Sequence, residues 1–217
     1  MVSTLKVCEI FTSIQGESSY AGVPCAFIRL TGCNLRCTYC DTKYAYDEGV
    51  ELTLDEVAQK ATSTGTKLVE ITGGEPLMQQ PSIALAERLS LDGLTVLVET
   101  NGSLDISPLK GIPGVTVIMD LKTPSSGMSA HNDYANIARL TPEDEVKFVI
   151  GSRDDYTWAA QIIRRYEIDK KCLALMSPAE TSLTPKVLTG WILEDKLDVR
   201  LNVQIHKYIF GPNQRGV

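Results

Sequence analysis

Short apolar segments alternate with amphipathic segments along most of this chain, and this alternation limits the possible folds more than any other feature. Strands that alternate with helices form parallel sheets with the helices outside, so we expect an α/β fold. The strands are predicted at 5–11, 24–30, 68–71, 94–98, 115–119, 146–150, 173–176 and 199–203, and the helices at 54–62, 83–91, 156–166 and 187–193.

The chain gives no sign of internal division. Its 217 residues contain no repeat, low-complexity tract or linker, and its hydrophobic share of 43% is ordinary for a globular protein. We therefore expect a single domain over residues 1–217. The helix at 54–62 should begin with a capping box formed by Thr53 and Glu56.

Glycines and polar side chains gather where the predicted strands end. Thr72-Gly73-Gly74-Glu75-Pro76 follows one strand, Glu99-Thr100-Asn101-Gly102 the next, and Asp120-Leu121-Lys122 the one after. Parallel sheets and barrels bind their ligands at the carboxyl ends of the strands. Paired glycines also let a ligand approach the backbone closely. We expect the functional site at this edge.

Three of the six cysteines, Cys33, Cys37 and Cys40, form the pattern CxxxCxxC directly after the predicted strand 24–30. Three thiolates are one ligand short of the four that complete a structural zinc site or an ordinary iron–sulfur cluster. The spacing favours a 4Fe-4S cluster with one iron open to another ligand. Two alternatives remain: disulfide bonding, and a zinc site completed by a remote ligand, with candidates at Cys8, Cys25, Cys172, His131 and His206.

Charge and hydropathy exclude several classes of function. The net charge is −6 and no cluster of Lys and Arg is present, which argues against direct nucleic-acid binding. The sequence has neither a membrane-spanning apolar segment nor a signal-peptide core. We therefore expect a cytoplasmic protein whose cysteines stay reduced, which makes disulfides an unfavourable explanation of the cysteine motif.

Arg29 is a charged residue inside an otherwise apolar predicted strand. A charge in such a segment is costly unless it is paired or faces a cleft. Because Arg29 lies three residues before the cysteine loop begins at Gly32, the cleft explanation is favoured.

The cysteine motif, Tyr39 before its last cysteine, and Gly73-Gly74-Glu75-Pro76 at the end of the next strand together resemble the radical S-adenosylmethionine (SAM) superfamily. The resemblance implies that SAM binds the open iron of the 4Fe-4S cluster. An electron from the cluster then cleaves SAM, and the resulting radical abstracts hydrogen from the substrate. The cofactor supplies the chemistry, while the protein supplies position and excludes water.

A closer resemblance extends over nearly the whole chain, to the 7-carboxy-7-deazaguanine synthase family. It rests on Ile10-Phe11-Thr12-Ser13-Ile14-Gln15-Gly16-Glu17, Phe27-Ile28-Arg29-Leu30, Cys40-Asp41-Thr42, Ile71-Thr72-Gly73-Gly74-Glu75-Pro76, Glu99-Thr100-Asn101-Gly102, Gln204-Ile205-His206-Lys207 and Arg215-Gly216-Val217. This family of lyases converts 6-carboxy-5,6,7,8-tetrahydropterin to 7-carboxy-7-deazaguanine in queuosine biosynthesis, with loss of ammonia. It uses SAM, the cluster and Mg²⁺.

The same resemblance implies an open, partial radical SAM β/α barrel with few helices, a homodimer, and flavodoxin or ferredoxin as electron donor. Hydrogen abstraction belongs to the SAM-derived radical, so no side chain is expected to be catalytic. The pterin substrate is expected to contact seven residues: Ile14, Gln15, Gly16, Glu17, Arg29, Thr72 and His206. Arg29 would hold the substrate carboxylate with its guanidinium fork, and His206 would reach the substrate from the last strand.

The family pattern also assigns cofactor contacts. Thr42 would lend its hydroxyl oxygen to Mg²⁺, a hard ion that favours oxygen ligands. SAM contacts are expected from ten residues: Tyr39, Asp41, Gly74, Glu75, Glu99, Asn101, Asp120, Leu121, Lys122 and Ser177. The sequence departs from the family at two of these places. Asp120-Leu121-Lys122 replaces the usual Ser-Pro-Lys, and Ser177-Pro178 replaces the usual Gln-Pro.

Two other functions remain open at the level of sequence. A glycyl-radical-enzyme activase shares the cysteine motif and the short length but acts on a protein. A metal-binding module without enzymatic activity would need only a structural metal site. The carboxylate of Val217 is a further open question, because in some relatives a C-terminal carboxylate reaches the substrate.

Overall fold

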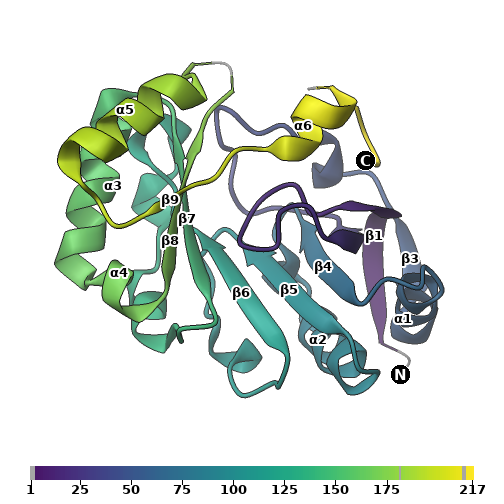
Figure 1. Cartoon of the computed structure of the whole chain (residues 1–217). Helices are drawn as coiled ribbons and strands as arrows, with labels where there is room; N and C mark the ends of the chain where they lie inside the picture. The colour runs from purple at the N-terminus through teal and green to yellow at the C-terminus, as the bar shows by residue number, and fades with distance from the viewer. Residues whose placement is uncertain (1–2, 181, 212–213) are drawn as a thin grey trace.

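The computed structural model describes residues 3–180, 182–211 and 214–217, and its strands form a nine-stranded sheet. The strand order is β3-β1-β2-β4-β5-β6-β7-β8-β9 (Figure 1). The strands are β1 (Thr4–Ile14), β2 (Pro24–Leu30), β3 (Val50–Thr53), β4 (Leu68–Gly73), β5 (Thr95–Thr100), β6 (Val115–Asp120), β7 (Glu145–Ile150), β8 (Leu173–Pro178) and β9 (Arg200–Leu201).

The strands from β2 across the sheet to β9 are parallel to their neighbours, as predicted. The first strand is different. β1 runs antiparallel to both β2 and β3, and it continues to Ile14, beyond its predicted end. A short connection cannot return a chain for parallel pairing, so the loop between Ile14 and Pro24 permits only the antiparallel arrangement. β3 was not predicted.

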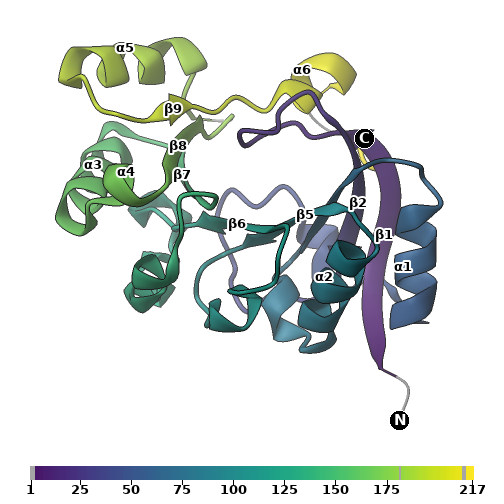
Figure 2. The same ribbon diagram turned by 60° about the horizontal axis from the view of Figure 1, so that its bottom comes forward.

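The helices are few, and α1 to α5 lie on the outer face of the sheet. α1 and α2 lie beside β1–β5, and α3, α4 and α5 lie beside β7–β9 (Figures 1 and 2). Only 3-10 turns occur between β5 and β7, so the predicted reduction in helices is confirmed. The α-helices are α1 (Leu54–Thr62), α2 (Pro81–Leu91), α3 (Arg153–Tyr166), α4 (Ile168–Lys171), α5 (Pro185–Asp195) and α6 (Ile205–Phe210), and the 3-10 helices span Lys43–Tyr46, Pro76–Met78, Ser107–Leu109, Pro124–Ser126, Ser129–His131 and Tyr134–Arg139.

Local sequence accounts for the helix starts. The side chain of Thr53 accepts a hydrogen bond from Glu56 N, and the Glu56 carboxylate accepts one from Thr53 N, so the predicted capping box is confirmed. Thr184 caps α5, which begins with Pro185, a residue that fits the first helical turn because its missing N–H is not needed there.

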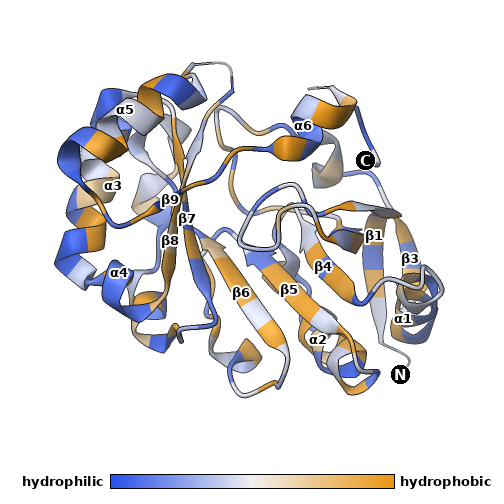
Figure 3. Cartoon of the chain, in the orientation of Figure 1, coloured by the Kyte–Doolittle hydropathy of each residue, from blue (hydrophilic) through white to orange (hydrophobic). Residues whose placement is uncertain are grey.

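The two faces of the sheet have different character because side chains alternate along each strand. On β4, Val69 and Ile71 join the main core under the helices. On the opposite face, Leu68 belongs to a smaller apolar cluster with Phe27 and Leu97. Orange apolar bands run along β4, β5 and β6 (Figure 3). The inner face thus has an apolar floor.

The fold is an open, mostly parallel sheet with few helices, and the predicted partial barrel is confirmed. None of the helices in the described part of the chain has the length and hydrophobicity that a bilayer crossing requires.

Candidate active site

A cavity of about 720 Å³ opens on the inner face of the sheet, at the carboxyl ends of the strands. Each central strand contributes a polar side chain to it from an inward-facing position in its carboxyl-terminal half or near its middle, and β4 contributes Glu70 as well. The others are Arg29 on β2, Thr72 on β4, Glu99 on β5, Asp120 on β6, Lys147 on β7 and Ser177 on β8. The regular alternation of the strands therefore builds a polar rim above the apolar floor.

The cysteine loop covers one side of this cavity. It begins at Gly32, whose φ of 96° is left-handed and favours glycine. Gly74 at the end of β4 packs against it so closely that a Cβ there would lie 2.1 Å from Gly32 O and 2.8 Å from Cys33 Cβ. The paired glycines thus let the end of β4 approach the cysteine loop.

Cys33, Cys37 and Cys40 are free, half-buried, and all line the cavity. Burial raises the pKa of the Cys33 and Cys37 thiols. The donor set fits a 4Fe-4S cluster, which takes one thiolate on each of three separate irons and so needs no convergence on a single point. By contrast, no group of three or more His, Cys, Asp or Glu residues in the described ranges could hold one metal ion. A zinc site completed by a remote ligand therefore has no supporting group of ligands in those ranges.

The loop after β1 lies across the floor of the cavity and is held by Gln15. Gln15 is 4% exposed, and its Oε1 accepts a hydrogen bond from Glu17 N at 2.7 Å. Its Nε2 donates to the carboxyl group of Glu70 on β4. Its backbone N–H also donates to Val23 O at 2.8 Å. Gln15 is therefore fixed by hydrogen bonds from both its side chain and its backbone. The cavity is lined by all four residues of this segment, Ile14, Gln15, Gly16 and Glu17.

Arg29 lines the cavity and also forms an ion pair with Glu9. Both conditions under which a charge is tolerated in an apolar strand are therefore met. Its Nε donates to Glu9 Oε1 at 2.8 Å, and Tyr44 Oη donates to the same oxygen at 2.8 Å. The terminal nitrogens of Arg29 make no hydrogen bond within the described residues, which leaves its fork available to a carboxylate. Arg215, near the C-terminus, pairs with Glu9 at 3.4 Å and stacks over Tyr44 at 3.7 Å.

His206 was predicted to reach the cavity from the end of the last strand, but it does so from the first turn of α6. β9 is short and ends at Leu201, because the chain turns into α6 to dock on the loop after β1. Ile205 N donates to Gly16 O at 3.0 Å, and a Cβ on Gly16 would lie 1.9 Å from His206 Nδ1. Burial lowers the pKa of His206, which favours the neutral imidazole.

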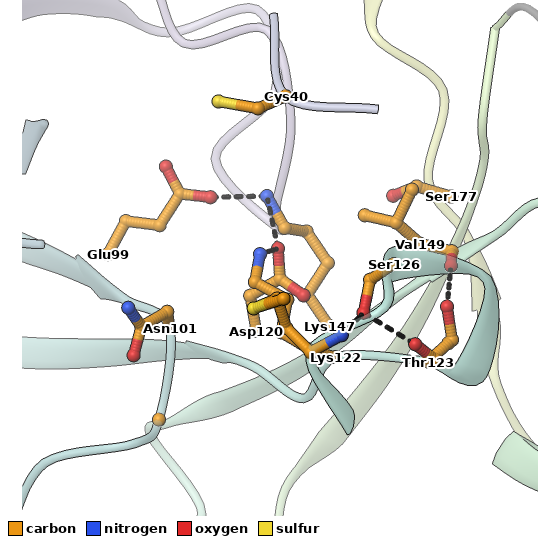
Figure 4. A network of polar contacts seen from close by, with 12 residues as sticks. Cys40, Glu99, Asn101, Asp120, Lys122, Thr123, Ser126, Lys147, Val149 and Ser177 are labelled. Carbon is orange, nitrogen blue, oxygen red and sulfur yellow. Dashed lines mark hydrogen bonds and ion pairs between the residues drawn. The ribbon is translucent and has the colours of Figure 1, made fainter. Parts of the chain in front are cut away.

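Lys147 is the central charge of the cavity, with a side chain that is 7% exposed. It pairs with Glu99 and with Asp120, the latter at 3.9 Å (Figure 4). It also pairs with Glu17 at 3.0 Å. Burial opposes the charge of Lys147, but these carboxylates raise its pKa well above the ordinary value. Burial likewise opposes ionisation of Glu99, yet Lys147 and Lys122 lower the pKa of Glu99 to about 2.

Asp120 and Lys122 form a second ion pair at the end of β6, with 2.8 Å between Nζ and Oδ2. The other Asp120 oxygen, Oδ1, is buried and has no hydrogen-bond partner within the described residues. Such an atom is costly to leave unpaired. Since Asp120 lines the cavity, a ligand with a hydroxyl or N–H group could satisfy this oxygen.

Asn101 holds the end of β5 to the cysteine loop. Its Nδ2 donates to Asn34 Oδ1 at 3.0 Å and lies 3.9 Å from Cys33 Sγ. N–H groups directed at a cysteine sulfur stabilise it when it ligates a metal and help to set the potential of an iron–sulfur cluster.

Two residues predicted to contact SAM do not line the cavity. Glu75 is fully buried, and its carboxylate accepts hydrogen bonds from Leu77 N, Thr100 Oγ1 and Asn101 N at 2.7–3.0 Å. It therefore fixes the ends of β4 and β5. Leu121 points into the main core under the helices because it follows Asp120 on the opposite face.

The residues just after the last cysteine also have protein partners. Lys207 on α6 pairs with Asp41 at 2.8 Å and with Glu180 at 3.3 Å. Burial works against ionisation of Asp41, but the charge and hydrogen bond of Lys207 lower its pKa below the ordinary value. Thr42 Oγ1 lies 3.4 Å from Asp41 Oδ1 and lines the cavity, which places two oxygen atoms close together beside Cys40.

The structure thus brings all the predicted site residues except Glu75 and Leu121 to one cavity. The residues not yet placed also line it: Tyr39, whose Oη is 3.5 Å from Thr123 Oγ1, and Ser177, whose Oγ accepts from Asn202 Nδ2 at 2.8 Å.

Sequence reasoning missed Glu70 and Lys147. Both carried the signal that identified Arg29, a charge inside an apolar strand, in Leu-Val-Glu-Ile and Glu-Val-Lys-Phe. It also missed Glu9, which pairs with Arg29, and the contact of Glu9 with Arg215 at the other end of the chain.

Comparisons with known proteins agree with this geometry. The sequence model of the Radical SAM superfamily matches residues 27–181. The chain is 44% identical over 216 residues to the 7-carboxy-7-deazaguanine synthase of Chlorobaculum tepidum, with 98% of this chain and 97% of the relative covered. It is 42% identical to the enzyme of the same name from Koribacter versatilis, with 98% and 100% covered.

A solved structure shares the fold. The crystal structure of QueE from Escherichia coli has a TM-score of 0.77 and 22% sequence identity, and the match covers 93% of this chain and 94% of that one. The sequence matches at more than 40% identity over nearly full length establish the family. The chain belongs to the 7-carboxy-7-deazaguanine synthase family of the radical SAM superfamily.

Proposed function

We propose that this protein converts 6-carboxy-5,6,7,8-tetrahydropterin to 7-carboxy-7-deazaguanine with loss of ammonia, in 7-deazapurine (queuosine) biosynthesis. The observation that carries the proposal is the convergence of the three motif cysteines and the available fork of Arg29 on one cavity. A volume of about 720 Å³ lies within the range of about 300–1,000 Å³ that is usual for small-molecule sites. It suits a small heterocycle better than the protein substrate of a glycyl-radical activase.

The roles of the residues follow from their contacts. Cys33, Cys37 and Cys40 would hold a 4Fe-4S cluster, which supplies the electron that cleaves SAM. Arg29 would bind the substrate carboxylate with its two terminal nitrogens, held in place by Glu9. The loop of Gln15 would border the pterin ring.

Other residues would orient SAM and the metal. Gly74 would bring backbone groups close to the amino group of SAM, and Asp120 Oδ1 would take a ribose hydroxyl because it is otherwise unpaired. We assign Mg²⁺ to Thr42, whose oxygen stands beside Cys40, because Mg²⁺ prefers oxygen ligands and keeps several waters. His206, kept neutral by burial, could donate or accept a hydrogen bond at the substrate.

At the level of the whole protein, we propose a single radical SAM domain over residues 1–217, in the cytoplasm, reduced by flavodoxin or ferredoxin. We further propose a homodimer. On α6, the apolar side chains of Tyr208 and Ile209 are 93% and 54% exposed. A second copy of the chain could cover this surface. Gln214, Arg215, Gly216 and Val217 line the cavity, so a contact of the terminal carboxylate with substrate belongs to the same proposal.

An anaerobic assay tests the function. Reconstituted protein receives SAM, Mg²⁺, the carboxytetrahydropterin and either dithionite or reduced flavodoxin, and 7-carboxy-7-deazaguanine is measured by mass spectrometry. We expect product with wild type and none with Cys37→Ala. Iron, sulfide and SAM cleavage are measured in the same sample. An intact cluster that cleaves SAM but forms no deazaguanine would contradict the proposal.

A further inference from the structure

Glu70 is a buried carboxyl group in the middle of β4 to which no role has been assigned. The residue is 4% exposed and lines the cavity. On the two flanking strands it stands opposite Phe27 and Leu97, which belong to the apolar floor, and Thr72 lies two residues further along the same face. A carboxyl group in such surroundings is costly unless it has polar partners.

Gln15 supplies one partner and leaves the second oxygen of Glu70 without one. Oε2 accepts a hydrogen bond from Gln15 Nε2, and Oε1 has no hydrogen-bond partner within the described residues. The amide orientation of Gln15 is set by Glu17 N, which must meet the oxygen of the amide. Nε2 is therefore directed at Glu70, and the second carboxyl oxygen of Glu70 is left to accept a hydrogen bond from a ligand in the cavity.

The charges around Glu70 favour a ligand that carries N–H groups. Burial raises the pKa of Glu70 well above its usual value, and Glu99 and Glu17 act in the same direction. Lys147 and Arg29 oppose them but do not bond to the carboxyl group. N–H donors from a ligand would stabilise the ionised form where the protein has provided only one such donor.

We propose that Glu70 is a specificity-determining residue that accepts hydrogen bonds from the N–H groups of the 2-aminopyrimidinone ring of the substrate. This inference rests on the proposed function. The ring carries a 2-amino group beside the N3–H, and a planar pair of donors matches a carboxylate. Arg29, on the neighbouring strand β2, would hold the carboxylate of the same molecule, so the protein would recognise two separate parts of it.

The test compares two ligands that differ at the 2-position. Dissociation constants of 6-carboxypterin and 6-carboxylumazine, which has an oxo group in place of the 2-amino group, are measured by fluorescence on reconstituted, SAM-loaded protein. Wild type should prefer the pterin by about tenfold or more, because the 2-oxo group of the lumazine is a hydrogen-bond acceptor and would face the Glu70 carboxylate, which is also an acceptor. Glu70→Gln keeps an oxygen for Gln15 Nε2 and places an N–H₂ group beside the oxo group, so the preference should fall by about tenfold or reverse.

The ratio of the two constants decides the result. A Glu70→Gln protein that loses affinity for both ligands equally, or keeps the wild-type ratio, would show that Glu70 only supports the Gln15 loop and would overturn the inference. If Glu70→Gln does not fold, Glu70→Val is judged by the same ratio. Asp144→Asn is the matched control, because Asp144 is a buried carboxylate that pairs with Lys110 and does not line the cavity. The ratio of the two dissociation constants for this variant should stay at the wild-type value. Wild type that binds neither ligand would instead overturn the proposed function itself.

Discussion

Lys147 is the positive charge that three carboxylates of the cavity share. Glu17, Glu99 and Asp120 all lie within 3.9 Å of its Nζ, and each would otherwise be a negative charge in a partly buried space. Removing one partner of a buried ion pair is costly because the other charge stays behind without compensation. The cavity therefore depends on this one side chain for its charge balance.

Lys147→Met should lower the free energy of unfolding by about 3–5 kcal/mol, measured by urea denaturation of the cluster-free protein. Adding Glu99→Gln should recover part of the loss, because one uncompensated carboxylate disappears. Lys170→Met is the surface control. Lys170 pairs with Glu167 in solvent, so its loss should change little. A double variant no more stable than Lys147→Met would show that Lys147 and Glu99 are not coupled.

The raised pKa of Glu70 predicts a pH dependence of stability. A carboxyl group whose folded pKa lies above its unfolded value contributes stability that is complete below the unfolded pKa. This contribution is lost as the pH rises through the folded pKa. Glu70→Gln does not titrate. The unfolding free energy of the variant relative to wild type should therefore rise with pH above about 4.5, by up to about 1.4 kcal/mol per pH unit.

Thermal or urea unfolding of both proteins in the cluster-free state, at several values between pH 5 and 8, measures this difference. A difference that stays constant across the range would mean that Glu70 is already ionised in the folded protein.

At the level of elements, the end of β4 and the loop after β2 must meet almost backbone to backbone. Gly74→Ala would place a Cβ 2.1 Å from Gly32 O, and a backbone atom cannot rotate out of the way as a side chain can. We expect the cysteine loop to shift. Iron and sulfide content after anaerobic reconstitution should then fall at least about threefold, and SAM cleavage with it.

Gly190→Ala is the matched control for this substitution. Gly190 lies in α5, and a Cβ there has nothing within 4 Å. Alanine favours helix over glycine by about 1 kcal/mol, so this variant should keep its full cluster content and unfold at the same temperature or higher. A Gly74→Ala protein that also reconstitutes fully would show that the close contact is not needed to form the cluster site.

α6 and the C-terminal segment after it contact N-terminal parts of the chain beside the cavity. Its first turn bonds to Gly16, its Lys207 pairs with Asp41, and the C-terminal segment that follows pairs Arg215 with Glu9 on β1. In Figure 2 the C-terminus lies beside β1, at the far end of the sheet from β9. The open side of the barrel is therefore bordered by the C-terminal segment, and the cavity needs both ends of the chain.

At the level of the whole molecule, the open sheet explains how inward-facing residues from separate strands build one site. Parallel strands place their carboxyl ends along one edge, so Arg29, Thr72 and Glu99 become neighbours although they come from three separate segments. The connections between β5 and β7, which contain only short 3-10 helices, do not alter this, since the sheet register depends on the strands and their core contacts.

The sequence by itself determined the features that depend on neighbouring residues. Strand and helix positions followed from apolar spacing, the start of α1 from the Thr53 and Glu56 pair, and the cysteine site from a motif of eight consecutive residues, Cys33 to Cys40. Family motifs identified most of the residues that line the cavity. These patterns are readable because the physical forces that produce them act within a few residues.

Only the tertiary structure decided which polar groups meet across the sheet. Gln15 bonds to Glu70 over 55 positions, and Lys147 pairs with Glu17 over 130. It also decided that β1 runs antiparallel, that Glu75 is buried, and that His206 lies on a helix. Such contacts depend on strand register and on how the two chain ends pack together. No local pattern encodes these, because their free energy arises only when distant segments are brought into contact.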